Sequence, residues 1–311
     1  MTSLSPTVLA PARPRVPAPL LVLGGVVSVQ LGAAVAKQLF PRLGAEGTVL
    51  LRLVAGAALL WLVVRPGRRT PARLDPRLTL AFGVVLATMN LSFYLALERI
   101  PLGIAVALEF LGPLVVALAG ARRRRDLGAA GVAALAVVLL TGFGGLGAGR
   151  LDPVGVVFAL FAGVCWAAYI LLSGRVGAAT PGLAGLAAAA TVAGVLLLPV
   201  GIASAGAALL DPGLLALGAA VGLLSAAVPY GLELVALRTL PAAVFAVLMS
   251  LEPAVGALAG FVVLRERLTP AEIAGVLLVC VASVAVTRTA SAAPSQPLSR
   301  RGRPRASRPA R

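Results

Sequence analysis

The 311-residue sequence contains no histidine, only two cysteines, and charged residues make up just 12% of it. Without histidine the chain lacks the commonest general base and metal ligand in proteins. Cys165 and Cys280 lie in separate apolar runs, where cysteine packs as a small hydrophobic residue, so no disulfide or zinc site is predicted. Phosphate-binding loops, Gly-x-Ser-x-Gly motifs and paired aspartates are also missing. The sequence therefore predicts no catalytic residues, no metal and no cofactor, and argues against an enzyme.

Apolar residues dominate the chain instead. They make up 59% of it and the mean hydropathy is +1.01, whereas soluble domains are near half apolar and about a quarter charged. A helix needs ~20 apolar residues to cross the hydrocarbon core of a membrane. Ten runs approach this length, at residues 19–39, 48–65, 77–97, 101–120, 127–146, 153–174, 181–202, 212–235, 241–263 and 269–287. We therefore expect an all-α membrane protein with ten transmembrane helices.

The net charge of +16 comes from basic residues at the ends of these runs. No groove-like basic face is formed, so nucleic-acid binding is not predicted. With the N-terminus in the cytoplasm, 20 of the 27 Lys and Arg residues lie on the cytoplasmic side, as the positive-inside rule requires. Both termini are expected to be cytoplasmic. The basic segments 1–18 and 289–311 are rich in Pro, and we expect them to be disordered.

An internal repeat divides the apolar region. Residues 96–120 (ALERIPLGIAVALEFLGPLVVALAG) match residues 236–260 (ALRTLPAAVFAVLMSLEPAVGALAG) at an offset of 140. The repeat predicts two five-helix units, at residues 19–148 and 149–288. Because five is odd, the second unit enters the membrane from the opposite side, which makes the repeat inverted. Secondary transporters often have this construction, with the substrate site between the repeats.

A few charged residues fall inside the apolar runs, where each costs ~2.5–3.5 kcal/mol on insertion scales and is expected to be functional or paired. They are Lys37, Arg52, Glu109, Glu233 and Glu252. Lys37 and Arg52 lie near the ends of their runs, so each is either a site residue or an interfacial anchor. Glu266, between Arg265 and Arg267, is expected to form a local ion pair.

Glu109 is the sharpest of these candidates. Pro113 lies four residues later, and a proline clashes with the carbonyl at that distance and removes one helical hydrogen bond. The sequence therefore predicts a kink at Glu109, and broken helices in lipid face either protein or a water-filled cavity. The alternative is a neutral carboxyl that pairs with a neighbouring helix.

Uncharged polar and aromatic residues also recur within the runs. Asn90 and Tyr230 align at the repeat offset, Tyr94 lies four residues after Asn90, and Tyr230 shares a helix face with Glu233. Such groups either line a solute pathway or form hydrogen bonds between helices. Gln30, Trp166 and Tyr169 are weaker candidates, since ordinary packing also explains the two aromatic residues.

Several motifs along the chain match those of a known family. The most specific stretch is residues 100–114, IPLGIAVALEFLGPL. Shorter matching motifs are Gln30–Ala33, Ala36-Lys37, Leu51–Leu53, Met89-Asn90, Phe93-Tyr94, Cys165–Ala167, Pro229-Tyr230, Leu232-Glu233 and Glu252–Ala254. Over residues 18–288 the chain thus resembles the EamA-domain branch of the drug/metabolite transporter superfamily, and within it the bacterial inner-membrane exporters of threonine and homoserine. The resemblance implies efflux of small neutral amino acids across the inner membrane, driven by the proton-motive force.

The resulting hypothesis is an exporter that works by alternating access between two inverted halves. A threonine-like zwitterion would bind between Lys37, Asn90, Tyr94, Tyr230 and Glu233, and Glu109 would exchange the coupled proton. Its partners would be the amino acid, protons and membrane lipid; the sequence specifies no oligomeric state. Efflux of another metabolite or a drug on the same scaffold, a membrane enzyme acting on lipid-linked substrates, and a sensor or scaffold remain the alternatives.

Overall fold

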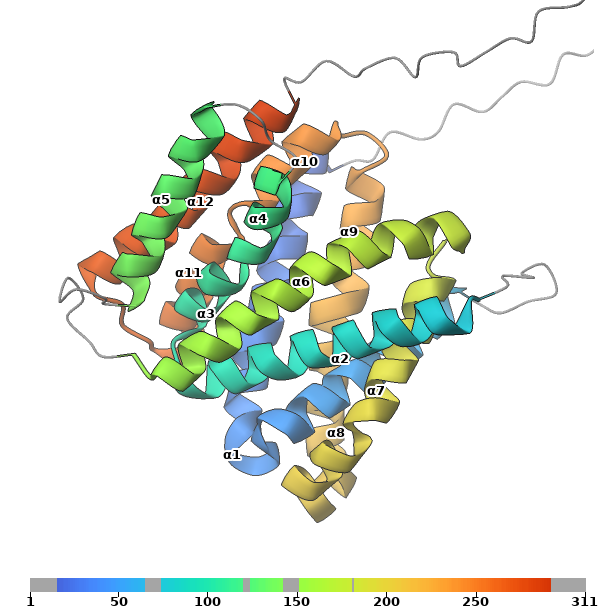
Figure 1. Ribbon diagram of the computed structural model, residues 1–311. Helices are drawn as coiled ribbons and strands as arrows, with labels where there is room; N and C mark the ends of the chain where they lie inside the picture. Colours follow the sequence, from blue (N-terminus) through green and yellow to red (C-terminus); the bar gives the residue numbers. More distant parts are fainter. Residues whose placement is uncertain (1–15, 65–73, 120–123, 142–150, 181, 292–311) are drawn as a thin grey trace, which may run out of the picture.

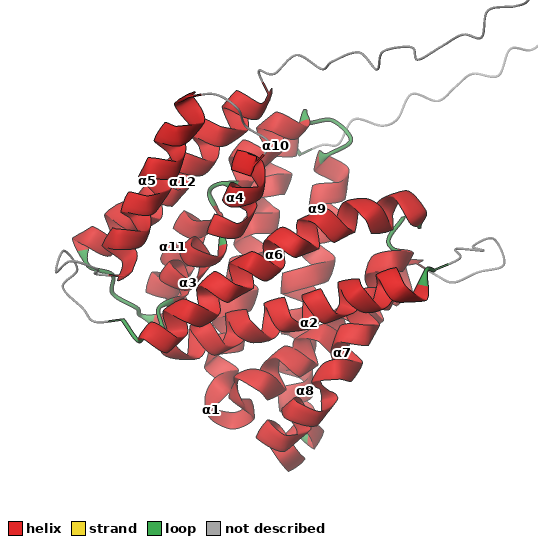
Figure 2. Ribbon diagram, in the orientation of Figure 1, coloured by secondary structure: helices red, strands yellow, loops and turns green. Residues whose placement is uncertain are grey.

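The computed structural model describes residues 16–64, 74–119, 124–141, 151–180 and 182–291. Within these ranges the chain consists of helices joined by short loops and turns, without strands (Figure 2). Eight helices are long and apolar enough to cross a membrane, and a shorter apolar helix covers Gly128–Thr141. The prediction of an all-α chain is confirmed for these ranges. Most of the two segments predicted to be disordered lies outside them, although the last helix continues to Ser291.

The elements follow one another with short connections, and most predicted runs correspond to one helix or a broken pair of helices. In chain order they are α1 (Ala18–Val64), α2 (Pro76–Arg99), α3 (Leu102–Glu109), α4 (Leu111–Ala119), α5 (Arg124–Thr141), α6 (Pro153–Ala179), α7 (Ala184–Ala205), the 3₁₀ helix η1 (Gly206–Leu210), α8 (Pro212–Gly222), the π-helical turn η2 (Leu223–Ala227), α9 (Val228–Ala236), α10 (Ala242–Met249), α11 (Glu252–Leu264) and α12 (Pro270–Ser291).

Asp-Pro pairs begin three of the helices. The side chains of Asp75, Asp152 and Asp211 cap α2, α6 and α8 by accepting hydrogen bonds from backbone N–H groups of the first turn. The proline that follows each aspartate is the first helical residue, where its missing N–H costs nothing. These local signals fix where the long helices start.

Two predicted runs, 19–39 and 48–65, belong to the single element α1, which is interrupted at Gly44. Gly44 has φ 67° and ψ 172°, a conformation that favours glycine. Two hydroxyl groups donate hydrogen bonds to backbone carbonyls at the bend. Ser204 donates to the Leu43 carbonyl at 3.2 Å, and Thr48 donates to the Gly44 carbonyl at 2.7 Å. The connector expected between the two runs is therefore a sharp bend at one residue.

The run at 101–120 breaks between α3 and α4, where Pro113 predicts it. The run at 241–263 breaks in the same way between α10 and α11. The two short helices α3 and α10 cover residues 102–109 and 242–249, so they are related by the 140-residue offset of the sequence repeat. Both halves of the chain thus carry a broken helix at the equivalent position.

The run at 212–235 contains a π-helical turn, η2, which the sequence did not predict. Pro229 cannot donate a hydrogen bond to Ser225 and clashes with its carbonyl, so the backbone widens over the preceding turn. Ser28 of α1 donates its hydroxyl proton to the Leu224 carbonyl at 2.7 Å. This hydrogen bond links the widened turn to α1.

Helices from the two halves interleave in space. α1 lies in the middle of the bundle and packs against α2, α7, α8, α9 and α11. α3 packs against α11, and α5 lies beside α12 at one edge of the molecule (Figure 1). α6 crosses the face formed by α2, α3 and α4. Its outer side exposes Val157, Val164 and Leu171, which are seven residues apart and form one apolar stripe.

Candidate functional site

A cavity of about 330 Å³ lies where the interrupted helices meet. Its walls come from both arms of α1 and from α2, α3, α6, α7, η2, α9, α10 and α11. Most of the lining is apolar, and the exceptions are Gln30, Arg52, Asn90, Glu109, Trp166, Tyr169, Ser225, Tyr230, Glu233 and Glu252. Eight of the ten predicted site residues are in this set; Lys37 and Tyr94 are not.

Three carboxyl groups line the cavity, and the helix breaks place two of them. Glu109 is the last residue of α3 and Glu252 is the first residue of α11. Glu233 comes from α9, and Glu252 lies within electrostatic range of both other carboxyls. None of the three carboxyl groups forms an ion pair with a Lys or Arg of the described residues, that is, none has such a nitrogen within 4.0 Å. The cavity therefore holds carboxyl groups without a protein counter-charge in contact.

Arg52, on the second arm of α1, is the only Lys or Arg among the described residues that line the cavity. Its guanidinium donates a hydrogen bond to Oδ1 of Asn90. Asn90 is fixed in turn, because its Nδ2 donates to the Leu86 carbonyl at 2.8 Å. Arg52 also lies against the ring of Tyr94, with Cζ 5.8 Å from the ring centroid.

Helix α6 seals the break beside Glu109. Gly163 of α6 approaches the backbone so closely that a Cβ added there would lie 2.8 Å from the Glu109 carbonyl oxygen. Gly112, just past the break, faces the Gly163 backbone with no room for a side chain. The carbonyl that Pro113 frees is therefore covered by protein, as broken helices in lipid require.

Aromatic side chains form the wall on the α6 side. Trp166 packs edge-on against Phe110, with ring centroids 5.4 Å apart, and Tyr169 stacks on Phe82 at 5.0 Å. Both aromatic side chains also line the cavity, so each contributes to helix packing and to the candidate site. Gln30, which is 2% exposed, also lines the cavity, and its Oε1 has no hydrogen-bond partner among the described residues.

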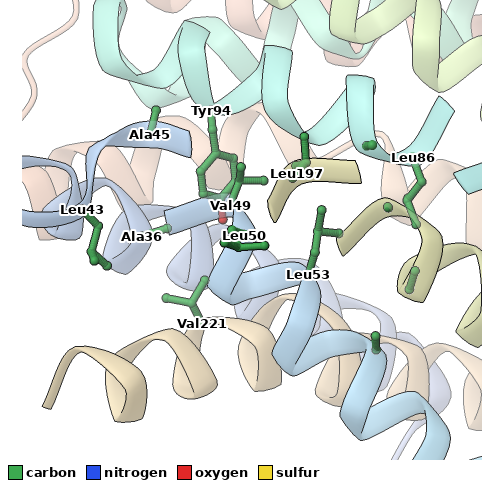
Figure 3. Packing of buried hydrophobic residues seen from close by; sticks show 14 of the residues in the cluster. Ala36, Leu43, Ala45, Val49, Leu50, Leu53, Leu86, Tyr94, Leu197 and Val221 are labelled. Atoms are coloured by element: carbon green, nitrogen blue, oxygen red, sulfur yellow. The ribbon is translucent and has the colours of Figure 1, made fainter. Parts of the chain in front are cut away.

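Tyr94 lies in the hydrophobic core rather than in the cavity. It is 1% exposed and points from α2 into a cluster that includes Val49 and Leu50 (Figure 3). Its ring packs on Phe40 and supports the Arg52 guanidinium. Tyr94 thus borders the site through Arg52.

Lys37 lies outside the cavity lining, in an ion pair with Glu266 at 2.8 Å. Its ammonium also donates to the Ile100 carbonyl at 2.9 Å, and Glu266 Oε2 accepts from the Leu102 N–H at 2.8 Å. The expectation that Glu266 pairs locally with Arg265 or Arg267 is therefore wrong. The chain reverses at Arg265, which adopts the left-handed conformation (φ 59°), and Glu266 turns toward α1 and α3.

The ranking of the two basic residues also differs from the expectation. Sequence reasoning favoured Lys37 over Arg52 as a site residue, whereas Arg52 is the one that lines the cavity. Its spacing from Asn90 carries no sequence signal, because the two residues lie on different helices. Ser225 was missed as well, since the π-helical turn that brings it to the cavity was not predicted.

No group of three or more His, Cys, Asp or Glu side chains is placed to hold a metal ion in the described part of the chain. Cys165 and Cys280 are both buried, with free thiols. The site thus consists of one guanidinium, three carboxyls, two amides and several aromatic or hydroxyl groups in an apolar wall. Such a set can bind a small molecule that carries both charges.

The chain is similar to known transporters. Residues 153–288 match the EamA-like transporter family. The chain is 42% identical over 271 residues to the threonine/homoserine exporter RhtA of Escherichia coli (strain K12), covering 87% of this chain and 91% of that protein. The RhtA protein of Salmonella typhimurium (strain LT2) shows the same identity and coverage.

A protein of known crystal structure that is 20% identical in sequence is similar in fold to most of this chain. The TM-score is 0.56, over 86% of this chain and 96% of that one, which shows a shared fold alone. Because its helices are apolar and it is 42% identical to RhtA over most of its length, the chain is an integral membrane protein that belongs to the EamA-like transporter family.

Proposed function

We propose that the protein exports small neutral amino acids of the threonine and homoserine type from the cytoplasm across the bacterial inner membrane. The observation that carries this is the 42% identity, over 87% of the chain, to exporters named for these two substrates. The cavity supports it, because about 330 Å³ is at the small end of ligand pockets and suits a compact solute. Its mixed charges suit a zwitterion better than an apolar drug.

The proposed architecture has ten crossings in two inverted five-helix halves. α1 contains 47 residues and would be about 70 Å long if straight, more than twice the hydrocarbon thickness of about 30 Å. Its two arms on either side of Gly44 therefore count as two crossings, and α5 adds the tenth to the eight long apolar helices. Both termini are then cytoplasmic. The matching breaks at α3–α4 and α10–α11 support the repeat.

In this proposal the zwitterion binds in the cavity, with its ammonium group facing the carboxyl of Glu233 on α9. Asn90, Tyr230, Gln30 and the aromatic wall surround it. The two halves then rearrange so that the cavity opens alternately to either side. The interrupted helices suit this motion, because short segments joined at breaks move more easily than continuous rods.

Glu109 is the proposed proton-exchanging group. It lines the cavity at the end of α3, where the helix dipole does not favour an anion, whereas Glu252 begins α11 and lies at the favourable end. The dipole of its own helix therefore supports an anion at Glu109 less than the dipole of α11 supports one at Glu252. A group that gains and loses a proton at this position would link the proton gradient to the rearrangement.

The test is amino-acid efflux from proteoliposomes with an imposed pH gradient. Wild-type protein should move labelled L-threonine and L-homoserine faster with the gradient than without it. Glu109→Gln should lose the acceleration and retain exchange of labelled for unlabelled threonine. Glu98→Gln is the matched control, because Glu98 is exposed and pairs with Arg99 away from the cavity. Gradient-driven flux that is unchanged in Glu109→Gln would remove this role from Glu109.

A further inference from the structure

We infer that Arg52 is the group that binds the carboxylate of the transported amino acid, and that Asn90 is a positioning residue that holds the Arg52 guanidinium toward the cavity. The inference rests on the proposed function and adds the chemical basis of its selectivity for carboxylates. Lys37, the cation among the binding residues predicted from the sequence, does not line the cavity.

The first step is the state of the two cations on α1. Lys37 already has a carboxylate at 2.8 Å and a backbone carbonyl at 2.9 Å, so its charge is matched within the protein. Arg52 has the neutral oxygen of Asn90 as its hydrogen-bond acceptor and forms no ion pair among the described residues. A guanidinium offers five N–H donors, so most of its capacity is free for a ligand.

The second step is the geometry around Arg52. Three carboxyls line the same cavity, and Glu109 is within electrostatic range of Arg52, yet none contacts it. A cation held in an apolar wall without a counter-ion is costly. A ligand carboxylate would supply the missing charge, and arginine binds carboxylates through two parallel hydrogen bonds. The cavity that Arg52 and the three carboxyls line together then suits a molecule with charges of both signs.

The third step is the support for the guanidinium. Asn90 Nδ2 is committed to the Leu86 carbonyl, so Oδ1 must face Arg52 as an acceptor. The Tyr94 ring lies against the guanidinium on another side. Two neutral contacts therefore orient the group without neutralising it. An acidic residue in place of Asn90 would neutralise the positive charge of Arg52, which the substrate carboxylate needs.

The experiment measures counterflow of labelled L-threonine in proteoliposomes and its inhibition by unlabelled L-threonine or by L-threoninol, which has a hydroxymethyl group instead of the carboxylate. In the wild type, threonine should inhibit at a concentration about tenfold or more below that of threoninol. Arg52→Gln should raise the KM for threonine by about tenfold or more and make the two inhibitors nearly equal. Arg42→Gln, an exposed arginine on the same helix, should leave both values unchanged.

Two further variants keep the test decisive if Arg52→Gln fails to fold, which thermal unfolding of the purified protein would reveal. Arg52→Lys keeps the charge without the planar fork and should raise the KM by less while retaining a preference for threonine over threoninol. Asn90→Leu leaves Arg52 in place but frees its guanidinium, so the KM for threonine should rise and the preference for threonine over threoninol should shrink.

The outcomes separate the two proposals. Threonine flux in the wild type, with a KM within twofold and an unchanged threonine preference in a folded Arg52→Gln protein, would overturn the assignment of Arg52 alone. If Arg52→Gln does not fold, an unchanged KM and threonine preference in a folded Asn90→Leu protein would overturn the joint assignment of Arg52 and Asn90. Wild-type proteoliposomes that carry neither threonine nor homoserine would overturn the proposed function, and the role of Arg52 with it.

Discussion

Two basic residues of α1, fifteen positions apart, lie in opposite kinds of surroundings. Lys37 and Glu266 satisfy each other, and both also bind the backbone where α2 ends and α3 begins. Arg52 faces a cavity with three carboxyls that it does not contact, and its own partner is a neutral amide. The first region is complete without a ligand, whereas the second leaves charges of both signs unmatched.

The difference separates structural charges from charges available to a substrate. The Lys37–Glu266 pair connects α1 to the turn after α11 and, through Leu102, to α3, so it joins the two halves of the chain. The Arg52 region leaves space between the same halves. Natural proteins often keep such unsatisfied groups at functional sites and gain stability elsewhere.

The largest effect on stability is expected from breaking the Lys37–Glu266 ion pair. Glu266→Gln leaves the Lys37 ammonium without a counter-charge, and the paired side chains are only 21% and 15% exposed. We expect a loss of about 3 kcal/mol in the free energy of unfolding, at the lower end of the range for buried pairs. Denaturant unfolding of the purified protein in mild detergent measures it.

The control for this variant is Glu98→Gln, which removes the exposed pair with Arg99 and should cost less than about 1 kcal/mol. Replacing Lys37 by Met together with Glu266→Gln should recover much of the loss, because no unpaired charge is left. Equal losses in Glu266→Gln and Glu98→Gln would contradict the structural role of the Lys37–Glu266 pair.

The next effect concerns the packing beneath the cavity. In Gly163→Ala the new methyl group meets the Glu109 carbonyl, so α6 must move away from the break between α3 and α4. We expect a loss of about 1–3 kcal/mol in the free energy of unfolding, as for other overpacked positions, together with slower gradient-driven export.

Gly174→Ala is the matched change on the same helix, because no atom lies within 4 Å of a Cβ added at Gly174. It should be neutral or stabilising by up to about 1 kcal/mol, since alanine is the better helix former. Similar losses in the two variants would show that the close approach at Gly163 has no special role.

The smallest effect on stability is expected in the cavity. Glu252 is 6% exposed but has no ion-pair partner among the described residues, so Glu252→Gln removes no favourable pair. Removing an unpaired buried charge stabilises the protein, and loss of the interaction with the α11 dipole offsets part of this gain. The net change in the free energy of unfolding should therefore stay below about 1 kcal/mol. A loss as large as that of Glu266→Gln would contradict the distinction between the two regions.

The sequence predicted the helical segments well, because hydropathy and proline positions act locally. The break at Glu109 follows from Pro113, and the structure ends α3 at that residue. The bend at Gly44 and the π-helical turn before Pro229 were missed, since they depend on how α1 and α7 pack and on where the backbone can widen. Their polar groups are satisfied by residues distant in the chain, Ser204 and Ser28.

The candidate site was predicted in part. Polar residues in apolar runs are costly, so their type alone marked eight residues that line one cavity. That these residues bind substrate stays a prediction. The relative roles of Lys37 and Arg52 could not be predicted, because position along a helix does not say which distant side chain faces it.

By itself the sequence determined the class of the protein and the position of its helices, through apolar length, and the broken helix at Glu109, through proline chemistry. Only the tertiary structure decided which charges meet. Glu266 is 229 residues from Lys37 and Asn90 is 38 residues from Arg52. Contacts of this range depend on how each helix is rotated and packed against its neighbours, so folding leaves Lys37 paired and Arg52 facing the cavity.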